Sequence, residues 1–385
     1  MRTLTLVLAL AAGASVVACS AILGLQEPTV DNGIGDGSGG GDGSGGGDGS
    51  GGGDGSGGDG GACGKDCLGG ACTNGQCQPV SVASGYSDFG TIAATPGGVF
   101  FTDFNGGKVV RVNPDGGTQI IGDPSNGLGD VWGVASDGTS VYITDGYNYA
   151  IDKCPVSGCT SSSNQWLGAD AGLNRPAYIA LDNNDVYFLD VYAAGVYHTT
   201  KAGGSATQLA VSDTGYYAGV LAGFAYDGTR VYWTEPYNGT SNLKSVPNGG
   251  GSVTTLFTNG PPQPRAPIVL GGDVFFVSRG GAGSIQRIKA DGTEPSPQSV
   301  AGGQNNPFDL TTDGQFLYWV NEGTIDSTGL PTAATTDGQV VRCAVGNCQP
   351  EVLASNLKAP VGIAVDGAAL YFLTYMDGQV WRLAK

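Results

Sequence analysis

One short apolar phrase recurs seven times along the 385-residue chain and restricts the folds open to it. Successive copies start 42 to 45 residues apart, except for a last interval of 53 in which Ile325 to Thr336 reads as an inserted loop. A period in the forties with about four short β-rich strands per unit is typical of blades packed around an axis. The sequence therefore predicts an all-β, seven-bladed β-propeller. The phrases VFFTD, VYITD, VYFLD, VYWTE, VFFVS, LYWVN and LYFLT begin at Val99, Val141, Val186, Val231, Val274, Leu317 and Leu370.

A strand of small or aliphatic residues precedes most of these phrases and ends at an aspartate. Small side chains suit the innermost strand of a blade, where space at the axis is short, and aspartate followed by Gly or Asn favours a turn. We expect these aspartates to form turns, at Asp137, Asp182, Asp227, Asp313 and Asp366.

The third strand of each unit has a position that is almost always basic. The only histidine of the chain occupies it once, which indicates a structural variant rather than a catalytic base. The seven residues are Arg111, Lys153, His198, Lys244, Arg287, Arg342 and Arg382.

The final unit, which follows LKAP, contains only three strands. The missing strand is found far upstream, because CQPVSVAS at 77–84 matches CQPEVLAS at 348–355 in spacing and character. We therefore expect Val80–Ser84 to pair into the last blade, beside Gln379 to Leu383, and to close the ring.

The VYWT and LYWV phrases, the G-I-A-x-D-G lead-in and the x-V-x-R strand resemble YWTD- and NHL-type β-propellers, a group that includes the class B repeats of the low-density-lipoprotein receptor. The resemblance covers 80–385 and implies a propeller closed by its N-terminal strand. Only Asp103 and Asp145 complete the T-D ending of the phrase. Because that aspartate is largely structural in the group, the resemblance implies the same role here.

Residues 1–18 carry one early arginine and an apolar run that is too short to span a membrane comfortably, which is typical of an export signal. Val16 to Cys19 resembles the lipobox of bacterial lipoproteins, in which the cysteine is acylated; an ordinary secretory cleavage site is the alternative. Ser20 resembles lipoproteins sent to the outer membrane, with inner-membrane retention as the alternative. We expect a lipid-anchored protein that faces the periplasm or the cell surface.

Residues 19–61 are dominated by D-G-S-G-G-G repeats and are expected to form a flexible linker, since they cannot bury enough apolar surface to order themselves. A small cysteine-rich module at 62–78 and the propeller at 79–385 follow. The formal charge of -17 disfavours nucleic acid as a partner.

Eight cysteines remain beside Cys19, an even number in an oxidising context, and they indicate disulfides rather than a zinc site. Cys154 with Cys159 and Cys343 with Cys348 are expected to bracket tight turns. The connectivity of the first four cannot be read from sequence alone. The shared spacing favours Cys72–Cys77, which leaves Cys63–Cys67.

Binding is expected on the rim formed by the loops that lead into the innermost strands and by those between second and third strands. These loops are longer and more aromatic than the opposite turns, and function concentrates on irregular loops held by a rigid frame. Aromatic side chains there could stack on sugars or anchor a peptide; capping of the core is the alternative. The candidates are Trp132, Tyr178 and Phe308 from the first loop set and Tyr147, Tyr149, Tyr192, Tyr237 and Tyr375 from the second.

Four acids end the second strand in successive blades, at Asp103, Asp145, Asp190 and Glu235. They would hold Ca²⁺ or Mg²⁺ if they converged, and structural hydrogen bonding is the simpler interpretation. No nucleophile elbow, phosphate loop or H-E-x-x-H motif is present. The sequence thus predicts a binding or scaffolding module for a protein, peptide or glycan, without a cofactor. The alternative is a metal-dependent propeller enzyme of the lyase or lactonase type.

Overall fold

The computed structural model describes residues 63–160, 164–211, 223–235, 241–279, 282–327 and 329–385. The predicted export signal, Cys19 and the linker lie outside these residues, as does Tyr237. No helix in the described ranges is long and apolar enough to cross a membrane.

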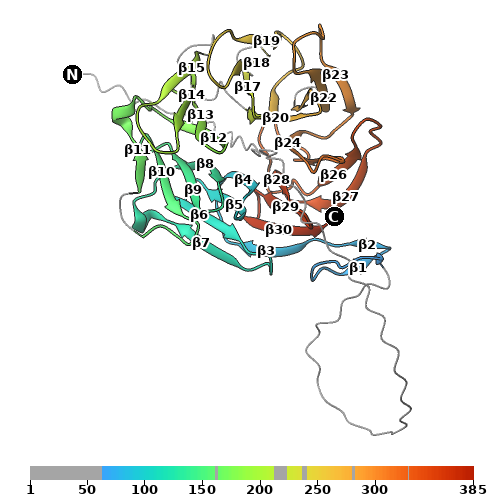
Figure 1. The fold of residues 1–385 in the computed structure, drawn as a ribbon. Coiled ribbons are helices and arrows are strands. Elements are labelled where there is room, and N and C mark those ends of the chain that lie inside the picture. Colours follow the sequence, from blue (N-terminus) through green and yellow to red (C-terminus); the bar gives the residue numbers. More distant parts are fainter. Residues whose placement is uncertain (1–62, 161–163, 212–222, 236–240, 280–281, 328) are drawn as a thin grey trace, which may run out of the picture.

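Seven four-stranded antiparallel sheets stand around a central axis as the blades of a propeller (Figure 1). Six blades are built from four strands in chain order, and the seventh takes β3 as its outermost strand; the first strand of each unit is innermost, so the predicted seven-bladed all-β fold is confirmed. Blade 1 comprises β4 (Phe89–Thr95), β5 (Gly98–Asp103), β6 (Lys108–Val112) and β7 (Thr118–Gly122), and blade 2 comprises β8 (Val131–Ser136), β9 (Ser140–Asp145), β10 (Ala150–Pro155) and β11 (Gln165–Leu167). Blade 3 comprises β12 (Pro176–Leu181), β13 (Asp185–Asp190), β14 (Gly195–Thr200) and β15 (Thr207–Val211), and blade 4 comprises β16 (Gly223–Tyr226), β17 (Arg230–Glu235), β18 (Asn242–Pro247) and β19 (Thr254–Phe257).

The remaining three blades follow the same plan. Blade 5 comprises β20 (Pro264–Leu270), β21 (Asp273–Ser278), β22 (Ser284–Lys289) and β23 (Gln298–Gly302). Blade 6 comprises β24 (Pro307–Thr312), β25 (Phe316–Asn321), β26 (Gly338–Ala344) and β27 (Glu351–Leu357). Blade 7 comprises β28 (Pro360–Val365), β29 (Ala369–Thr374), β30 (Gln379–Ala384) and β3 (Val80–Ser84). Two short 3₁₀ helices, Pro124–Asn126 and Ala169–Ala171, lie in the loops before β8 and β12.

The ring closes between the two ends of the described chain. β3 pairs antiparallel with β30, with Val80 opposite Arg382 and Ser84 opposite Gln379. In Figure 1 the blue β3 lies beside the red β30. The innermost strand β28 contacts β4 of blade 1, which completes the circle.

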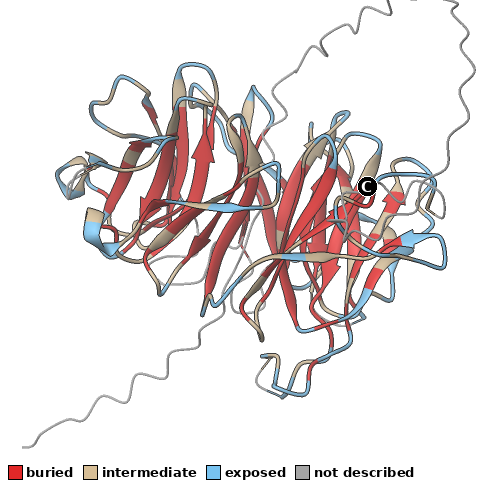
Figure 2. Cartoon of the chain, turned by 90° about the horizontal axis from the view of Figure 1, so that it is seen from below, coloured by how far each residue is buried: buried red, intermediate tan, exposed pale blue. Residues whose placement is uncertain are grey.

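The recurrent phrase forms the second strand of each blade. Figure 2 shows that most of the strand residues are buried. Trp233, Trp319, Tyr142 and Phe188 are among the fully buried side chains of the phrase. At roughly 25 cal/mol per Å² of apolar surface, burial of such large rings is the main stabilising contribution. One sheet alone could not provide that burial, since each blade covers the face of the next.

The predicted basic position of the third strand holds in six blades and is wrong for Lys244. Arg111 lies opposite Phe100 and His198 opposite Tyr187, each facing the second residue of the phrase. Lys244 lies opposite Trp233, one residue further along, and Ser245 takes the expected place. A one-residue shift sends a strand side chain to the other face.

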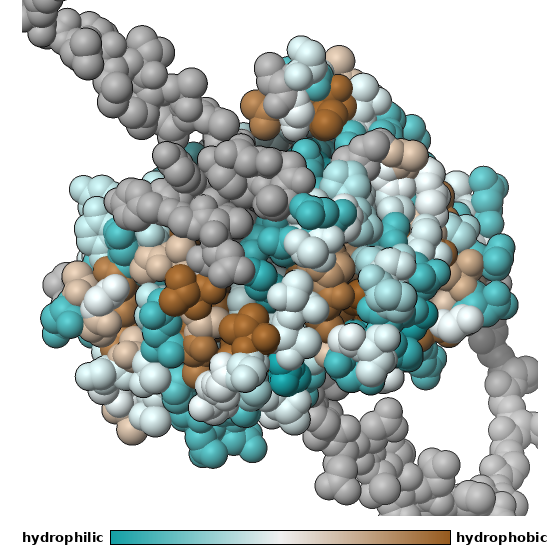
Figure 3. Space-filling model, turned by 90° about the horizontal axis from the view of Figure 1, so that it is seen from above, coloured by the Kyte–Doolittle hydropathy of each residue, from teal (hydrophilic) through white to brown (hydrophobic). Residues whose placement is uncertain are grey.

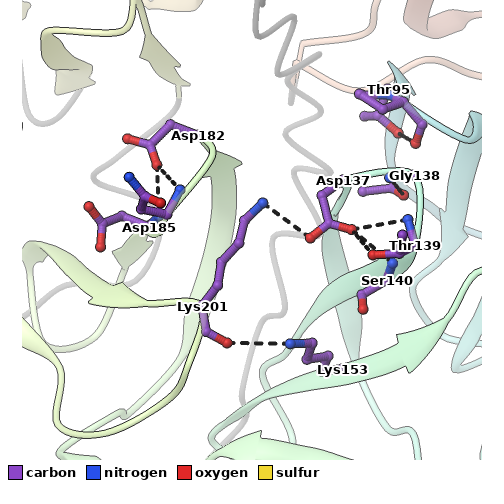
Figure 4. A network of polar contacts seen from close by, with 12 residues as sticks. Thr95, Asp137, Gly138, Thr139, Ser140, Lys153, Asp182, Asp185 and Lys201 are labelled. Atoms are coloured by element: carbon purple, nitrogen blue, oxygen red, sulfur yellow. Dashed lines mark hydrogen bonds and ion pairs between the residues drawn. The ribbon is translucent and has the colours of Figure 1, made fainter.

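The turn aspartates behave as predicted. Asp182 accepts hydrogen bonds from the backbone N–H groups of Asn184 (2.8 Å) and Asp185 (2.7 Å) and from the Tyr187 hydroxyl (2.9 Å). Figure 4 shows this turn beside that of Asp137, whose carboxylate also accepts from Lys201 of the next blade at 3.1 Å. The same backbone pattern occurs at Asp137, Asp227, Asp313 and Asp366.

The cysteine-rich module is a small cap built on the hairpin β1 (Cys72–Thr73) and β2 (Gln76–Cys77). Its disulfides are Cys63–Cys72 and Cys67–Cys77, so the predicted pairs Cys63–Cys67 and Cys72–Cys77 are wrong. Each cysteine of the hairpin forms a disulfide with a cysteine of the segment before it, so the two segments are covalently joined. The predicted pairs would have left the hairpin and the preceding segment without a disulfide between them.

The other two disulfides and the docking of the cap fit the predicted ring. Cys154–Cys159 and Cys343–Cys348 form as predicted, each across the connection between third and fourth strands. Arg382 of β30 donates to the carbonyls of Leu68 in the cap (2.7 Å) and Pro114 in blade 1 (2.9 Å). The cap therefore sits on the closing seam.

Candidate functional site

We call the loops before the innermost strands, together with the turns that follow the second strands, the loop rim. The turn rim is the opposite end, with the turns between first and second strands. A backbone hydrogen bond joins the two sets of the loop rim in blade after blade, as from Gly146 N to Asp130 O at 2.9 Å. Both sets therefore form one surface. The equivalent donors are Phe104, Val191, Arg279, Glu322 and Tyr375, and their acceptors are Asp88, Arg175, Gln263, Asn306 and Ala359.

The acids that end the second strands fasten this surface together. Asp145 accepts from Gly129 N (2.7 Å) in the loop before β8 and from Tyr147 N (3.1 Å) in the turn after β9. Asp190 accepts from Asn174 N at 2.7 Å in the same way. These carboxylates are occupied by backbone N–H groups, which matches the structural role that the resemblance implies.

Glu235 ends β17 but has different partners. Its carboxylate accepts from Trp233 Nε1 (2.9 Å) and Asn242 Nδ2 (3.1 Å) and lies 3.0 Å from Lys244 Nζ. Both charged side chains are buried. Because Lys244 stands one residue before the basic position of the other third strands, it reaches a buried acid.

The four proposed metal ligands do not come together. Within the described ranges, the only group of three or more His, Cys, Asp or Glu side chains close enough to share an ion is Cys63, Cys67 and Cys77. Those cysteines form disulfides. A central cation held by Asp103, Asp145, Asp190 and Glu235 is therefore not supported.

Blade 1 departs from the pattern through a residue that the sequence did not point to. Asp88, in the loop before β4, lies near Asp103 and is 7% exposed. Burial, and then the charge of Asp103, raise the pKa of Asp88 to about 6. Alignment of this loop with the one before β8, where Asp130 occupies the same place, could have found it.

Two of the predicted rim aromatics belong to the core. Tyr178 is 1% and Phe308 3% exposed, so both cap the core, which was the alternative for these residues. Trp132 is partly buried, with its ring 5.1 Å from that of Phe104 and 6.3 Å from that of Tyr178. Of the three, only Trp132 offers part of its surface.

Tyr147 and Tyr149 project from the turn after β9, with exposed fractions of 69% and 47%. Tyr149 has a φ of 54°, in the left-handed region. Gly107 and Gly378 hold the same place in blades 1 and 7, and Ala194 holds it in blade 3. A side chain in this conformation costs about 1 kcal/mol. Tyr149, which with Tyr147 is the most exposed aromatic pair among the described rim residues, therefore carries a local backbone cost.

Tyr192 and Tyr375 are partly buried at the same rim. Tyr192 accepts a hydrogen bond from the Arg175 guanidinium at 2.8 Å, and Arg175 also lies 3.8 Å from Asp130. Burial raises the pKa of Tyr375, and the charges of Asp88 and Glu322 add to that effect.

Two arginines and a glutamate lie around Phe308 at the same rim. The guanidinium groups of Arg265 and Arg279 lie 5.1 and 4.8 Å from the Phe308 ring centroid, and Arg279 pairs with Glu322. Burial, and then the charge of Arg279, lower the pKa of Arg265 to about 10. Sequence reasoning missed this group because its members lie in different blades.

The only histidine lies away from the rim aromatics. His198 is on β14, and its ring stacks at 6.1 Å on Tyr187, whose hydroxyl donates to Asp182 of the turn rim. The placement agrees with a structural role.

On the side of the molecule that Figure 3 shows, the described apolar residues are scattered. Figure 3 views the molecule from the side that carries β15, β19 and β23 at the top of Figure 1, and apolar groups there alternate with polar ones. Val211 and Val253 are among the exposed apolar residues. The aromatic residues of the loop rim are therefore the better candidate contacts.

No protein-family model matches the sequence, and no curated protein matches it. Solved structures do match. A catalytically inactive histidine-to-alanine variant of virginiamycin B lyase from Staphylococcus aureus, solved with quinupristin, gives a TM-score of 0.60 at 16% identity, over 80% of this chain and 98% of that one. A streptogramin B lyase gives 0.58 at 17%, over 80% and 96%. A chain of a nidogen/laminin complex gives 0.48 at 16%, over 71% and 96%.

The chain is a seven-bladed β-propeller, and its repeats resemble those of the YWTD and NHL types. At these identities the likeness concerns the fold alone, and folds of this kind carry unrelated functions. Function has to be argued from the loop rim.

Proposed function

We propose that the protein is an exported lipoprotein, held at the outer membrane through Cys19, whose propeller binds a protein, peptide or glycan at the loop rim. The observation that carries the binding role is the pair Tyr147 and Tyr149, exposed on a turn that Asp145 fastens to the rim. Rigid, exposed tyrosines supply large contact areas at a low entropic cost.

The anchor is supported by the sequence alone. An export signal at 1–18, the lipobox-like Val16 to Cys19 and the Gly-rich residues 19–61 together describe a body held away from a membrane. Cys19→Ala should release the protein into the soluble fraction, and unchanged membrane retention of this variant would contradict the anchor.

The enzyme alternative has less support. The lyase that resembles this fold is catalytically inactive when a histidine is replaced by alanine. Here the single histidine, His198, stacks on Tyr187, whose hydroxyl bonds to the turn rim. Of the carboxylates that would have held a central cation, Asp145 and Asp190 bind backbone N–H groups and Glu235 lies 3.0 Å from Lys244.

The binding role is tested with glycan and peptide arrays probed with the purified protein. Any ligand found is then titrated against the double variant Tyr147→Ala/Tyr149→Ala and against Val352→Ala, an exposed residue of the outer strand β27. Loss of two aromatic contacts of about 1 kcal/mol each should weaken binding about 30-fold, and the β27 variant should bind normally. Equal binding by all three proteins would rule out this turn as the contact.

A further inference from the structure

Within the residues that the structure describes, the acid that ends the second strand of blade 1 lacks the backbone hydrogen bond that blades 2 and 3 supply from the loop before the innermost strand. Asp145 and Asp190 each receive a 2.7 Å hydrogen bond from the loop before their innermost strand. Asp103 ends β5 at the same place, and its one hydrogen bond among the described residues comes from Gly106 N, at 3.3 Å in the following turn. The loop before β4 places the Asp88 carboxylate near Asp103, as the loop before β8 places Asp130 near Asp145.

Both carboxylates are buried. Asp88 is 7% and Asp103 3% exposed. Asp88 Oδ2 accepts from Asn105 Nδ2 at 2.9 Å, whereas Asp88 Oδ1 is enclosed without a hydrogen-bond partner. A buried carboxylate oxygen left in this way is costly unless a positive charge compensates it.

The next blade shows what such compensation looks like. Asp130 occupies the place of Asp88, since each of their carbonyls accepts the backbone N–H that follows the strand-ending acid. Asp130 has the Arg175 guanidinium at 3.8 Å. Neither Asp88 nor Asp103 forms an ion pair within the described part of the chain.

We propose that Asp88 and Asp103 bind Ca²⁺, with the Asn105 side-chain oxygen and water as further ligands. The donors are all oxygen, which suits a hard cation, and Ca²⁺ accepts the irregular geometry that a strand end and two loops provide better than Mg²⁺ does. The ion would join the loop before β4 to the turn after β5, as hydrogen bonds do in blades 2 and 3. That loop also leads out of β3, so the site lies next to the closing seam.

Calorimetric titration of the purified, chelator-treated protein with CaCl₂ tests the site. We expect one site with a Kd of about 10⁻⁴ to 10⁻³ M, in the range of extracellular modules. Thermal unfolding in about 5 mM CaCl₂ should show a Tm about 2 °C higher than in NaCl of equal ionic strength, with a smaller rise in MgCl₂.

Two variants make the test specific. Asp88→Asn keeps the shape and can donate to Asp103, so it should fold, bind Ca²⁺ at least about 10-fold more weakly and lose the Ca²⁺-dependent rise in Tm. Asp130→Asn, its counterpart in blade 2, should bind as the parent does. The proposal is overturned if the parent shows no binding heat and no Ca²⁺-dependent Tm, or if Asp88→Asn binds Ca²⁺ as well as the parent. A Tm that rises on acidification in the parent alone, without a Ca²⁺ effect, would mean that a proton takes the ion's place.

Discussion

The two rims of the propeller are built by the same strands but use their acids differently. On the turn rim, Asp182, Asp227, Asp313 and Asp366 repeat one arrangement, with two backbone N–H groups and a tyrosine hydroxyl on each carboxylate. On the loop rim the corresponding acids change partners from blade to blade. A purely structural role requires the same hydrogen bonds in every blade. The variation in hydrogen-bond partners on the loop rim indicates that individual residues there can serve binding.

The largest expected effect on stability concerns the buried ion pair of Glu235 and Lys244 in blade 4. Lys244→Met would leave Glu235 charged, buried and without its 3.0 Å partner, and we expect a loss of about 3 to 5 kcal/mol in the free energy of unfolding. Urea unfolding measures it. Adding Glu235→Gln should restore most of the loss, because the uncompensated charge is then removed. A single variant as stable as the parent would show that Glu235 does not depend on Lys244.

Replacing one aspartate of the turn rim should lower the free energy of unfolding by a smaller amount. Asp182→Ala removes an acceptor for the two tyrosine hydroxyls of Tyr187 and Tyr226 as well as the turn bonds, and we expect a loss of about 2 kcal/mol in unfolding free energy. Asp291→Ala is the matched control, since Asp291 accepts from Thr293 in an exposed turn without a tyrosine.

The same variant predicts a pH dependence. Hydrogen bonds outweigh the effect of burial and hold the pKa of Asp182 below its ordinary value. Its contribution is therefore complete above the unfolded pKa of about 3.9 and is lost as the pH falls through the lower folded pKa. Urea unfolding of parent and variant should converge in acid; a constant difference down to about pH 2 would contradict the shift.

Much of this architecture could be read from the sequence because it repeats. The seven phrases predicted the blades, and the match between 77–84 and 348–355 predicted β3 in the last blade. Lys244 was misplaced because residue type was aligned without the register, which only strand pairing fixes. The cap disulfides were misassigned because a shared spacing says nothing about which loop lies over a hairpin. Asp88 was missed because only the recurrent phrases were aligned, and its proximity to Asp103 becomes visible only when the loops before the innermost strands are aligned as well.

A third use of a carboxylate occurs at Asp152 of β10, close to the loop rim. Burial, and then the charge of Asp145, raise its pKa to about 7, and Asp152 Oδ2 is enclosed without a hydrogen-bond partner. The folded protein therefore binds this proton more tightly than the unfolded chain, so stability falls as the pH rises from about 4 through 7. Asp152→Asn should add about 1 to 2 kcal/mol near pH 8 and almost nothing near pH 4, as measured by urea unfolding. Equal effects at both values would contradict the raised pKa.

The smallest expected effect separates stability from binding at the loop rim itself. Tyr149→Gly relieves the left-handed backbone at φ 54° and removes an exposed ring, so it should leave the protein as stable or up to about 1 kcal/mol more stable while weakening the ligand found on the arrays. Ala194→Gly relieves the same conformation, φ 48°, in blade 3 without removing an aromatic ring. It should match the stability change and leave binding unchanged. If Tyr149→Gly instead destabilises the propeller, the tyrosine contributes to the fold. In this blade the loop rim would then have a structural role like that of the turn rim. The difference between the two rims would be smaller at the place where binding is proposed.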